Sequence, residues 1–255
     1  MARRQKTEKP PPLQLPDLAR VRRVPLAAPR ITALSNAWGG RSPAKWDRAW
    51  NDILWLAQKF LGAGQSETER KATWHHLLMA VGNFKRSAGH IFPEGLPDPS
   101  PGFVAPPNFV IPGLPRSIVV RDTPASWRNL TEVSGLGVPT ATTLLSALWP
   151  GYHVIIDIRA SRAAVGVTAG ARWDTTNRDH CALPLRNSKE EYWTFYGWYR
   201  PIVVASTSRR VQPVQVERAL YVLDGRTMRR LPSGRDWTWS DYRAMSENVL
   251  AGMTD

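Results

Sequence analysis

The stretch that decides the fold reads Val133-Ser134-Gly135-Leu136-Gly137-Val138-Pro139-Thr140, and a helix is predicted on each side of it. Thr123-Pro124 is a capping residue followed by a proline at the first helical position, which is typical of a helix start. The two glycines and the proline predict a tight turn, after which a second helix opens at Pro139 and closes at Pro150. Local patterns therefore predict a helix-hairpin-helix over residues 124–149.

A glycine hairpin of this kind has a chemistry that follows from its backbone. Glycines permit positive φ and let peptide N–H groups approach a ligand, and the next helix adds unpaired N–H donors with a partial positive charge. Phosphate is the expected ligand, and a purely structural turn between two helices is the alternative. The predicted backbone contacts to DNA are Gly135, Leu136, Gly137, Val138 and Thr140.

A carboxylate follows the second helix of the hairpin. The apolar run Val154-Ile155-Ile156 ends at Asp157, and a new helix is predicted over 158–165. Aspartate is among the best helix N-caps, so Asp157 either caps this helix only or caps it and also acts on a ligand beside the hairpin.

These residues resemble the base-excision DNA glycosylase superfamily, in which a Gly/Pro-rich loop and an aspartate follow a helix-hairpin-helix, as in the endonuclease III and 8-oxoguanine DNA glycosylase types. The resemblance is confined to residues 123–167. It implies an all-α protein that binds duplex DNA through its backbone and flips a damaged or modified base into a pocket. It also implies that Asp157 is the catalytic carboxylate, which stabilises positive charge on the sugar while the glycosidic bond breaks.

The sequence departs from the superfamily at one informative position. Members that also cleave the DNA backbone place a lysine two residues after the second hairpin glycine, where this chain has Pro139. Because a Schiff base requires an amine, we expect a monofunctional DNA N-glycosylase without AP-lyase activity. The nearest lysines in the sequence, Lys85 and Lys189, are both far from the hairpin.

Two other functions remain open from the sequence. The first is a non-catalytic helix-hairpin-helix DNA-binding protein, which the poor match outside the motif favours. The second is a basic structural protein of a nucleoprotein particle, which needs only the charge. A space for a nucleobase beside Asp157 favours the glycosylase, whereas a filled apolar wall there favours binding alone.

Charge and composition restrict the partners. The chain has 34 Lys and Arg against 21 Asp and Glu, for a formal net charge of +13. This predicts a polyanionic partner, here duplex DNA, and no obligate protein partner is inferred. Residues 1–30, with eight basic residues, two acids and six prolines, predict a disordered basic arm that either touches nucleic acid or only solubilises the chain.

The remaining expectations concern fold and cofactors. We expect an all-α fold, with an α-helical domain over 31–255 in which order begins near Ser42-Pro43. A single cysteine, Cys181, excludes an iron–sulfur cluster, and no metal or other cofactor is expected. No apolar run of membrane-spanning length and no signal-peptide core is present, which predicts a cytoplasmic protein without membrane association. The aromatic run from Tyr192 to Tyr199 is expected in the core rather than stacked on a base.

Overall fold

The computed structural model describes residues 24–38, 43–86, 128, 130, 131, 136–168, 189–232 and 237–253. Over these ranges the chain forms eight α-helices and no strand, with one isolated bridge between Ser208 and Val211. The predicted all-α class is therefore confirmed for the described part of the chain. The helices are α1 Ala28–Asn36, α2 Pro43–Leu61, α3 Glu67–Arg86, α6 Val138–Leu148, α7 Ile158–Thr168, α8 Lys189–Ala205, α9 Pro213–Arg230 and α10 Trp239–Ala251.

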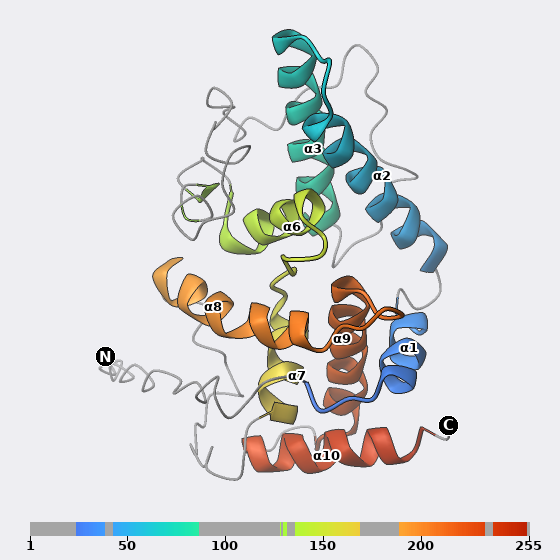
Figure 1. Cartoon of the computed structure of the whole chain (residues 1–255). Coiled ribbons are helices and arrows are strands. Elements are labelled where there is room, and N and C mark those ends of the chain that lie inside the picture. Colours follow the sequence, from blue (N-terminus) through green and yellow to red (C-terminus); the bar gives the residue numbers. More distant parts are fainter. Residues whose placement is uncertain are drawn as a thin grey trace, which may run out of the picture.

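The helices pack in two groups (Figure 1). In one group α2 packs on α3, and both contact α6. In the other, α9 is central and contacts α1, α7, α8 and α10. The segment 149–157 joins α6 of the first group to α7 of the second, so its residues lie where the two groups meet.

Two helix starts follow the sequence closely. Ser66 and Glu69 form the predicted capping box of α3, with Ser66 N donating to Glu69 Oε2 at 2.9 Å and Glu69 N donating to Ser66 Oγ at 3.2 Å. The helix α2 begins at Pro43, as the Ser42-Pro43 pair predicts. Such boundaries are predictable because the capping groups are neighbours in the sequence.

Order begins earlier than the sequence predicts. The helix α1 packs against α9, and Val24 is buried with its N–H donating to Ser206 Oγ at 2.8 Å. Residues 24–30 therefore belong to the folded domain and not to a disordered arm. The partner of this segment lies about 180 residues away in the chain, which local patterns do not reveal. Residues 1–23 of the predicted arm lie outside the described residues.

Two helix boundaries differ from those that the sequence predicts. Pro201 is expected to break or kink the aromatic helix, and it does not break it, since α8 continues through Pro201 to Ala205. The helix α9, expected to end at Asp224-Gly225, continues to Arg230. Asp224 is buried and bound from α7 and α10, and these contacts outweigh the cost of about 1 kcal/mol for one glycine inside a helix.

The aromatic run on α8 lies in the core, as predicted. Its buried members are Trp193, Phe195, Tyr196, Trp198 and Tyr199. Tyr196 also orders the segment that leads to Asp157, because its hydroxyl lies 2.9 Å from Nδ1 of the buried His153 and accepts from Val154 N at 3.3 Å. No helix among those described combines the length and the apolar character that crossing a membrane requires.

Candidate functional site

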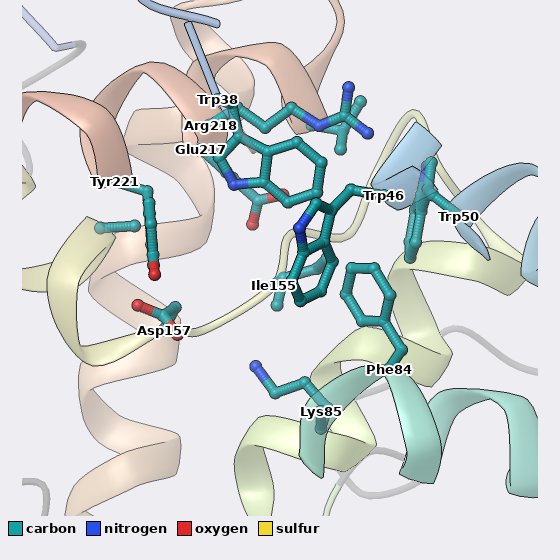
Figure 2. A pocket seen from close by; sticks show the side chains of 12 residues that line it. Trp38, Trp46, Trp50, Phe84, Lys85, Ile155, Asp157, Glu217, Arg218 and Tyr221 are labelled. Atoms are coloured by element: carbon teal, nitrogen blue, oxygen red, sulfur yellow. The ribbon is translucent and has the colours of Figure 1, made fainter. Parts of the chain in front are cut away.

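A pocket of about 310 Å³ lies where the two helix groups meet, and Asp157 is in its wall (Figure 2). Its volume is at the lower end of the range typical of small-molecule sites. Residues from α2, α3, α7 and α9 line it, together with the end of α1 and the segment before α7. They are Trp38, Trp46, Trp50, Phe84, Lys85, Ile155, Asp157, Ala160, Val214, Glu217, Arg218 and Tyr221.

One side of the pocket is an aromatic wall, formed by Trp38, Trp46, Trp50 and Phe84. Trp46 packs edge-on against Trp38, with ring centroids 5.4 Å apart, and against Phe84 at 5.6 Å. Trp50 contacts Phe84 from the other side at 5.7 Å. Each ring is held by its neighbours at a steep or tilted angle, so the wall is an apolar surface that presents both faces and edges of aromatic rings to a ligand.

Asp157 caps the helix α7, as both interpretations of the sequence predict. Its Oδ1 accepts a hydrogen bond from Arg159 N at 2.8 Å, and its carbonyl oxygen accepts from Ser161 N at 2.8 Å. Among the described residues no group donates to Oδ2. Capping therefore uses one carboxylate oxygen and leaves the other available to the pocket, where Asp157 lies below the ring of Tyr221 (Figure 2).

Lys85 enters the same pocket from the last turn of α3. Its amine points toward Asp157, although within the described chain it forms no ion pair or hydrogen bond (Figure 2). Burial lowers the pKa of the Lys85 amine, and the negative charges of Asp157 and Glu217 partly oppose this shift. The sequence gives no indication that Lys85 lies beside Asp157, because 71 positions separate them and only the packing of α3 on α6 brings them together.

Glu217 is a second carboxyl group in the pocket. Its exposed fraction is 5%, and neither side-chain oxygen has a hydrogen-bond partner among the described residues. Burial raises the pKa of Glu217 well above its ordinary value, and the negative charge of Asp157 adds to the shift. The Ile155 N–H, Lys85 and Arg218 oppose it, although the N–H does not reach either oxygen in hydrogen-bonding geometry. The raised pKa shifts the balance toward the uncharged acid, which has one donor and one acceptor.

Two arginines fix the rim of the pocket. Arg218 pairs with Asp47 of α2 at 2.6 Å, and its guanidinium lies 4.2 Å from the ring centroid of Trp38. Arg159 is exposed, lies 4.9 Å from the ring centroid of Tyr221 and donates to its hydroxyl at 2.9 Å. Arg159, two residues after Asp157 in the sequence, therefore places a positive charge against Tyr221 of the pocket wall.

The hairpin residues lie apart from the pocket, since none of the described ones lines it. Gly135 lies outside the described residues. Leu136 and Val138 are each 2% exposed and belong to the core, while Thr140 is half-buried. Gly137 is exposed and is the N-cap of α6, with no side chain capping that helix end.

The two-glycine turn suggests that a β-branched residue in place of Gly137 would strain the backbone and so weaken DNA binding, but the structure contradicts this expectation. Gly137 has φ −73° and ψ 165°, an extended conformation that any residue adopts. An added Cβ would meet only Pro139 Cδ at 3.8 Å, an ordinary contact. Backbone strain is therefore no reason for a larger side chain at this position to weaken DNA binding.

Histidines and metals contribute nothing to this site. Over the described ranges no group of three His, Cys, Asp or Glu side chains is arranged to hold a metal ion. His153 is buried against Trp149 and Tyr196, which is a structural role. Cys181 lies outside the described residues.

Comparisons of the chain with protein-family models, with curated proteins and with solved structures found no match.

Replacing Glu217 with glutamine should stabilise the protein, and the gain should grow as pH rises above about 4.5, the ordinary pKa of a glutamate side chain. A buried acid with a raised pKa binds its proton more tightly in the folded state, so the free energy of unfolding falls as pH rises between the unfolded and folded pKa values. Each unit of that shift is worth about 1.4 kcal/mol, and glutamine removes the loss. Urea unfolding of the wild type and Glu217→Gln at several pH values measures the difference in their free energies of unfolding. The control is Glu247→Gln, because Glu247 is exposed. A difference that does not change with pH would show that Glu217 is ionised in the folded protein.

Proposed function

We propose that this chain is a DNA glycosylase of the helix-hairpin-helix type, which excises a damaged or modified base through Asp157. The observation that carries the proposal is the pocket beside Asp157, where a carboxylate faces an aromatic wall across an empty space of about 310 Å³. A filled apolar wall at this place would have favoured the non-catalytic alternative.

The shape and lining of the pocket suit an extruded base. Enzymes that act on a base inside a duplex flip it into a pocket, where it stacks against aromatic or apolar side chains and its edge is read by hydrogen bonds. The aromatic wall supplies the stacking surface. Glu217, with both oxygens unpaired, supplies a donor and an acceptor for the edge of the base. The binding of a neutral, planar heteroaromatic group accounts for both features.

The position of Asp157 suits the chemistry at the sugar. Breaking an N-glycosidic bond develops positive charge on C1′ and O4′ of the deoxyribose, as in other glycoside hydrolyses. A carboxylate already fixed by its cap stabilises that charge without reorganising during the reaction. Asp157 Oδ1 is held by Arg159 N, which leaves Oδ2 to face the sugar once the base occupies the pocket.

Two further features support a DNA ligand. The net charge of +13 favours binding to a polyanion, and it predicts an affinity that falls steeply with salt. The exposed Arg159 lies against Tyr221 of the pocket wall, and its guanidinium would be available to a phosphate flanking a flipped nucleotide. The uncapped N-terminus of α6 at Gly137 fits a backbone phosphate as well.

The proposal is tested by release of free base from DNA. Duplexes that each carry one modified base are incubated with excess protein, and released bases are separated by chromatography. The proposal predicts release from at least one duplex at a rate far above the protein-free reaction. Tight, salt-dependent binding without release from any member of a broad panel would instead identify a non-catalytic DNA-binding protein.

A further inference from the structure

Lys85 stands out among the described lysines by its surroundings. Lys71 pairs with Glu67 at 2.8 Å on the surface, Lys59 lies over the exposed ring of Trp55, and Lys189 Nζ donates to Thr131 O at 2.7 Å. Lys85 has none of these structural roles. Its amine is directed into a pocket that also holds two carboxyl groups, yet among the described residues it is within 4.0 Å of neither.

This environment favours a nucleophilic amine. An ammonium group in apolar surroundings loses hydration, so burial lowers the pKa of Lys85 and increases the neutral fraction at a given pH. A neutral lysine amine is the usual protein nucleophile toward carbonyl carbons and their equivalents. The carboxylate of Asp157 lies across the same space and would hold a sugar carrying partial positive charge within reach of the amine.

We propose that Lys85 is a catalytic residue that bonds to C1′ of the deoxyribose as an imine, so that this chain also cleaves the DNA strand at the abasic site. This inference rests on the proposed function, since it places the sugar of the flipped nucleotide in the pocket. It replaces the expectation drawn from Pro139. The hairpin offers no amine, but α3 delivers one to the same carboxylate from a distant part of the chain.

The proposed reaction needs no co-reactant other than water. Lys85 Nζ attacks C1′ while the bond from C1′ to the base breaks, and the leaving base takes a proton that the amine gives up. The bond from C1′ to O4′ then opens, with O4′ taking a proton from solvent, which leaves a protonated imine. Loss of the C2′ proton and cleavage of the C3′–O bond expel the 3′ phosphate. Water then hydrolyses the imine, which returns the amine and leaves an aldehyde on the sugar.

A structural alternative gives Lys85 only a charge. In that case its ammonium would neutralise the charge of Asp157 or bind a phosphate, and a Lys85→Arg variant would keep this role. Two substitutions therefore separate the roles. Lys85→Met removes both charge and nucleophile at similar length, whereas Lys85→Arg keeps the charge and removes the nucleophile.

The test uses a duplex with a preformed abasic site, so that it does not depend on knowing the excised base. Full-length protein is mixed with this duplex and sodium borohydride near neutral pH, and the covalent adduct is quantified on a denaturing gel. We expect the wild type to be trapped, and Lys85→Met and Lys85→Arg each to lose at least about tenfold of the adduct. The matched control Lys71→Met, on the same helix but exposed, should be trapped like the wild type.

Two further readouts keep the result unambiguous. Peptide mapping of the adduct should place the reduced sugar on Lys85, and circular dichroism should show that the Lys85 variants are folded. Trapping of Lys85→Arg at the wild-type level, or an adduct mapped to another amine, would overturn the proposal. Base release that leaves an intact abasic strand, with no trapping, would also overturn it while leaving the proposed glycosylase function standing.

Discussion

Replacing Asp157 with asparagine should lower the single-turnover rate of base release by at least about a hundredfold on whichever duplex the wild type acts upon. In the proposed mechanism, the substitution removes the negative charge that stabilises the developing charge on the sugar, and a fixed electrostatic group of this kind is typically worth about 10²–10³ in rate. The fold should survive, because an asparagine side-chain oxygen also accepts the hydrogen bond from Arg159 N.

The control for this substitution is Asp241→Asn. Asp241 occupies the first turn of α10 outside the pocket and accepts a hydrogen bond from Thr238 N at 2.7 Å. The Asp241→Asn variant should release base at the wild-type rate. Affinity of Asp157→Asn for DNA should stay equal to or exceed that of the wild type, since a charge that repels phosphate is lost. Full activity in Asp157→Asn would assign the residue to helix capping alone.

The second large effect is expected at Asp224, which joins the three helices that hold the Asp157 side of the pocket. Asp224 is 1% exposed and binds Arg162 Nε at 2.7 Å and Arg162 Nη2 at 2.6 Å, while Tyr242 Oη donates to it at 2.8 Å. Asp224→Ala leaves the guanidinium and the hydroxyl without their acceptor. Breaking a buried pair in this way typically costs about 3–5 kcal/mol of unfolding free energy.

Urea unfolding measures this loss, and Glu247→Ala provides the comparison. Glu247 also pairs with an arginine, Arg243, but on the surface of α10, where an ion pair is worth about 0–1 kcal/mol. We expect Asp224→Ala to lose several times more stability than Glu247→Ala. Similar small losses in both variants would show that the Arg162 and Tyr242 contacts do not hold α7 and α10 on α9.

What the sequence predicts correctly here is mostly local. The capping box at Ser66 and Glu69, the start of α2 at Pro43 and the N-cap role of Asp157 all involve groups within three residues of each other. The aromatic run of α8 is correctly placed in the core because its spacing follows the helical period. Such features are determined by neighbouring residues and need no knowledge of packing.

The pocket itself is not predictable from local patterns. Trp46, Trp50 and Phe84 fall on the apolar faces of α2 and α3, so the sequence assigns them to the core, and only the packing leaves a space beside them. The sequence around Glu217 on α9 does not show that this glutamate is buried, because its burial depends on contacts with other helices. The 12 tryptophans of the sequence indicate a packed, aromatic-rich fold, but their number does not say where the rings meet.

Lys85 shows the same limit most clearly. In sequence it is remote from the hairpin, and on that ground we expected no amine near Asp157. The position of an amine in space depends on how α3 packs against α6 and on the path of the segment 149–157. A motif position such as Pro139 excludes a nucleophile at that position only, and not one from another helix.

In the proposed mechanism, the carboxylate of Asp157 faces positive charge on the sugar of a flipped nucleotide. Two abasic-site analogues in otherwise identical duplexes, a cationic pyrrolidine and a neutral tetrahydrofuran, test for this contact. Because the cation mimics the charge of the transition state, the wild type should bind the pyrrolidine duplex at least about a hundredfold more tightly. This preference should be largely lost in Asp157→Asn. Equal affinity of the wild type for the two duplexes, or a preference unchanged in Asp157→Asn, would contradict the account.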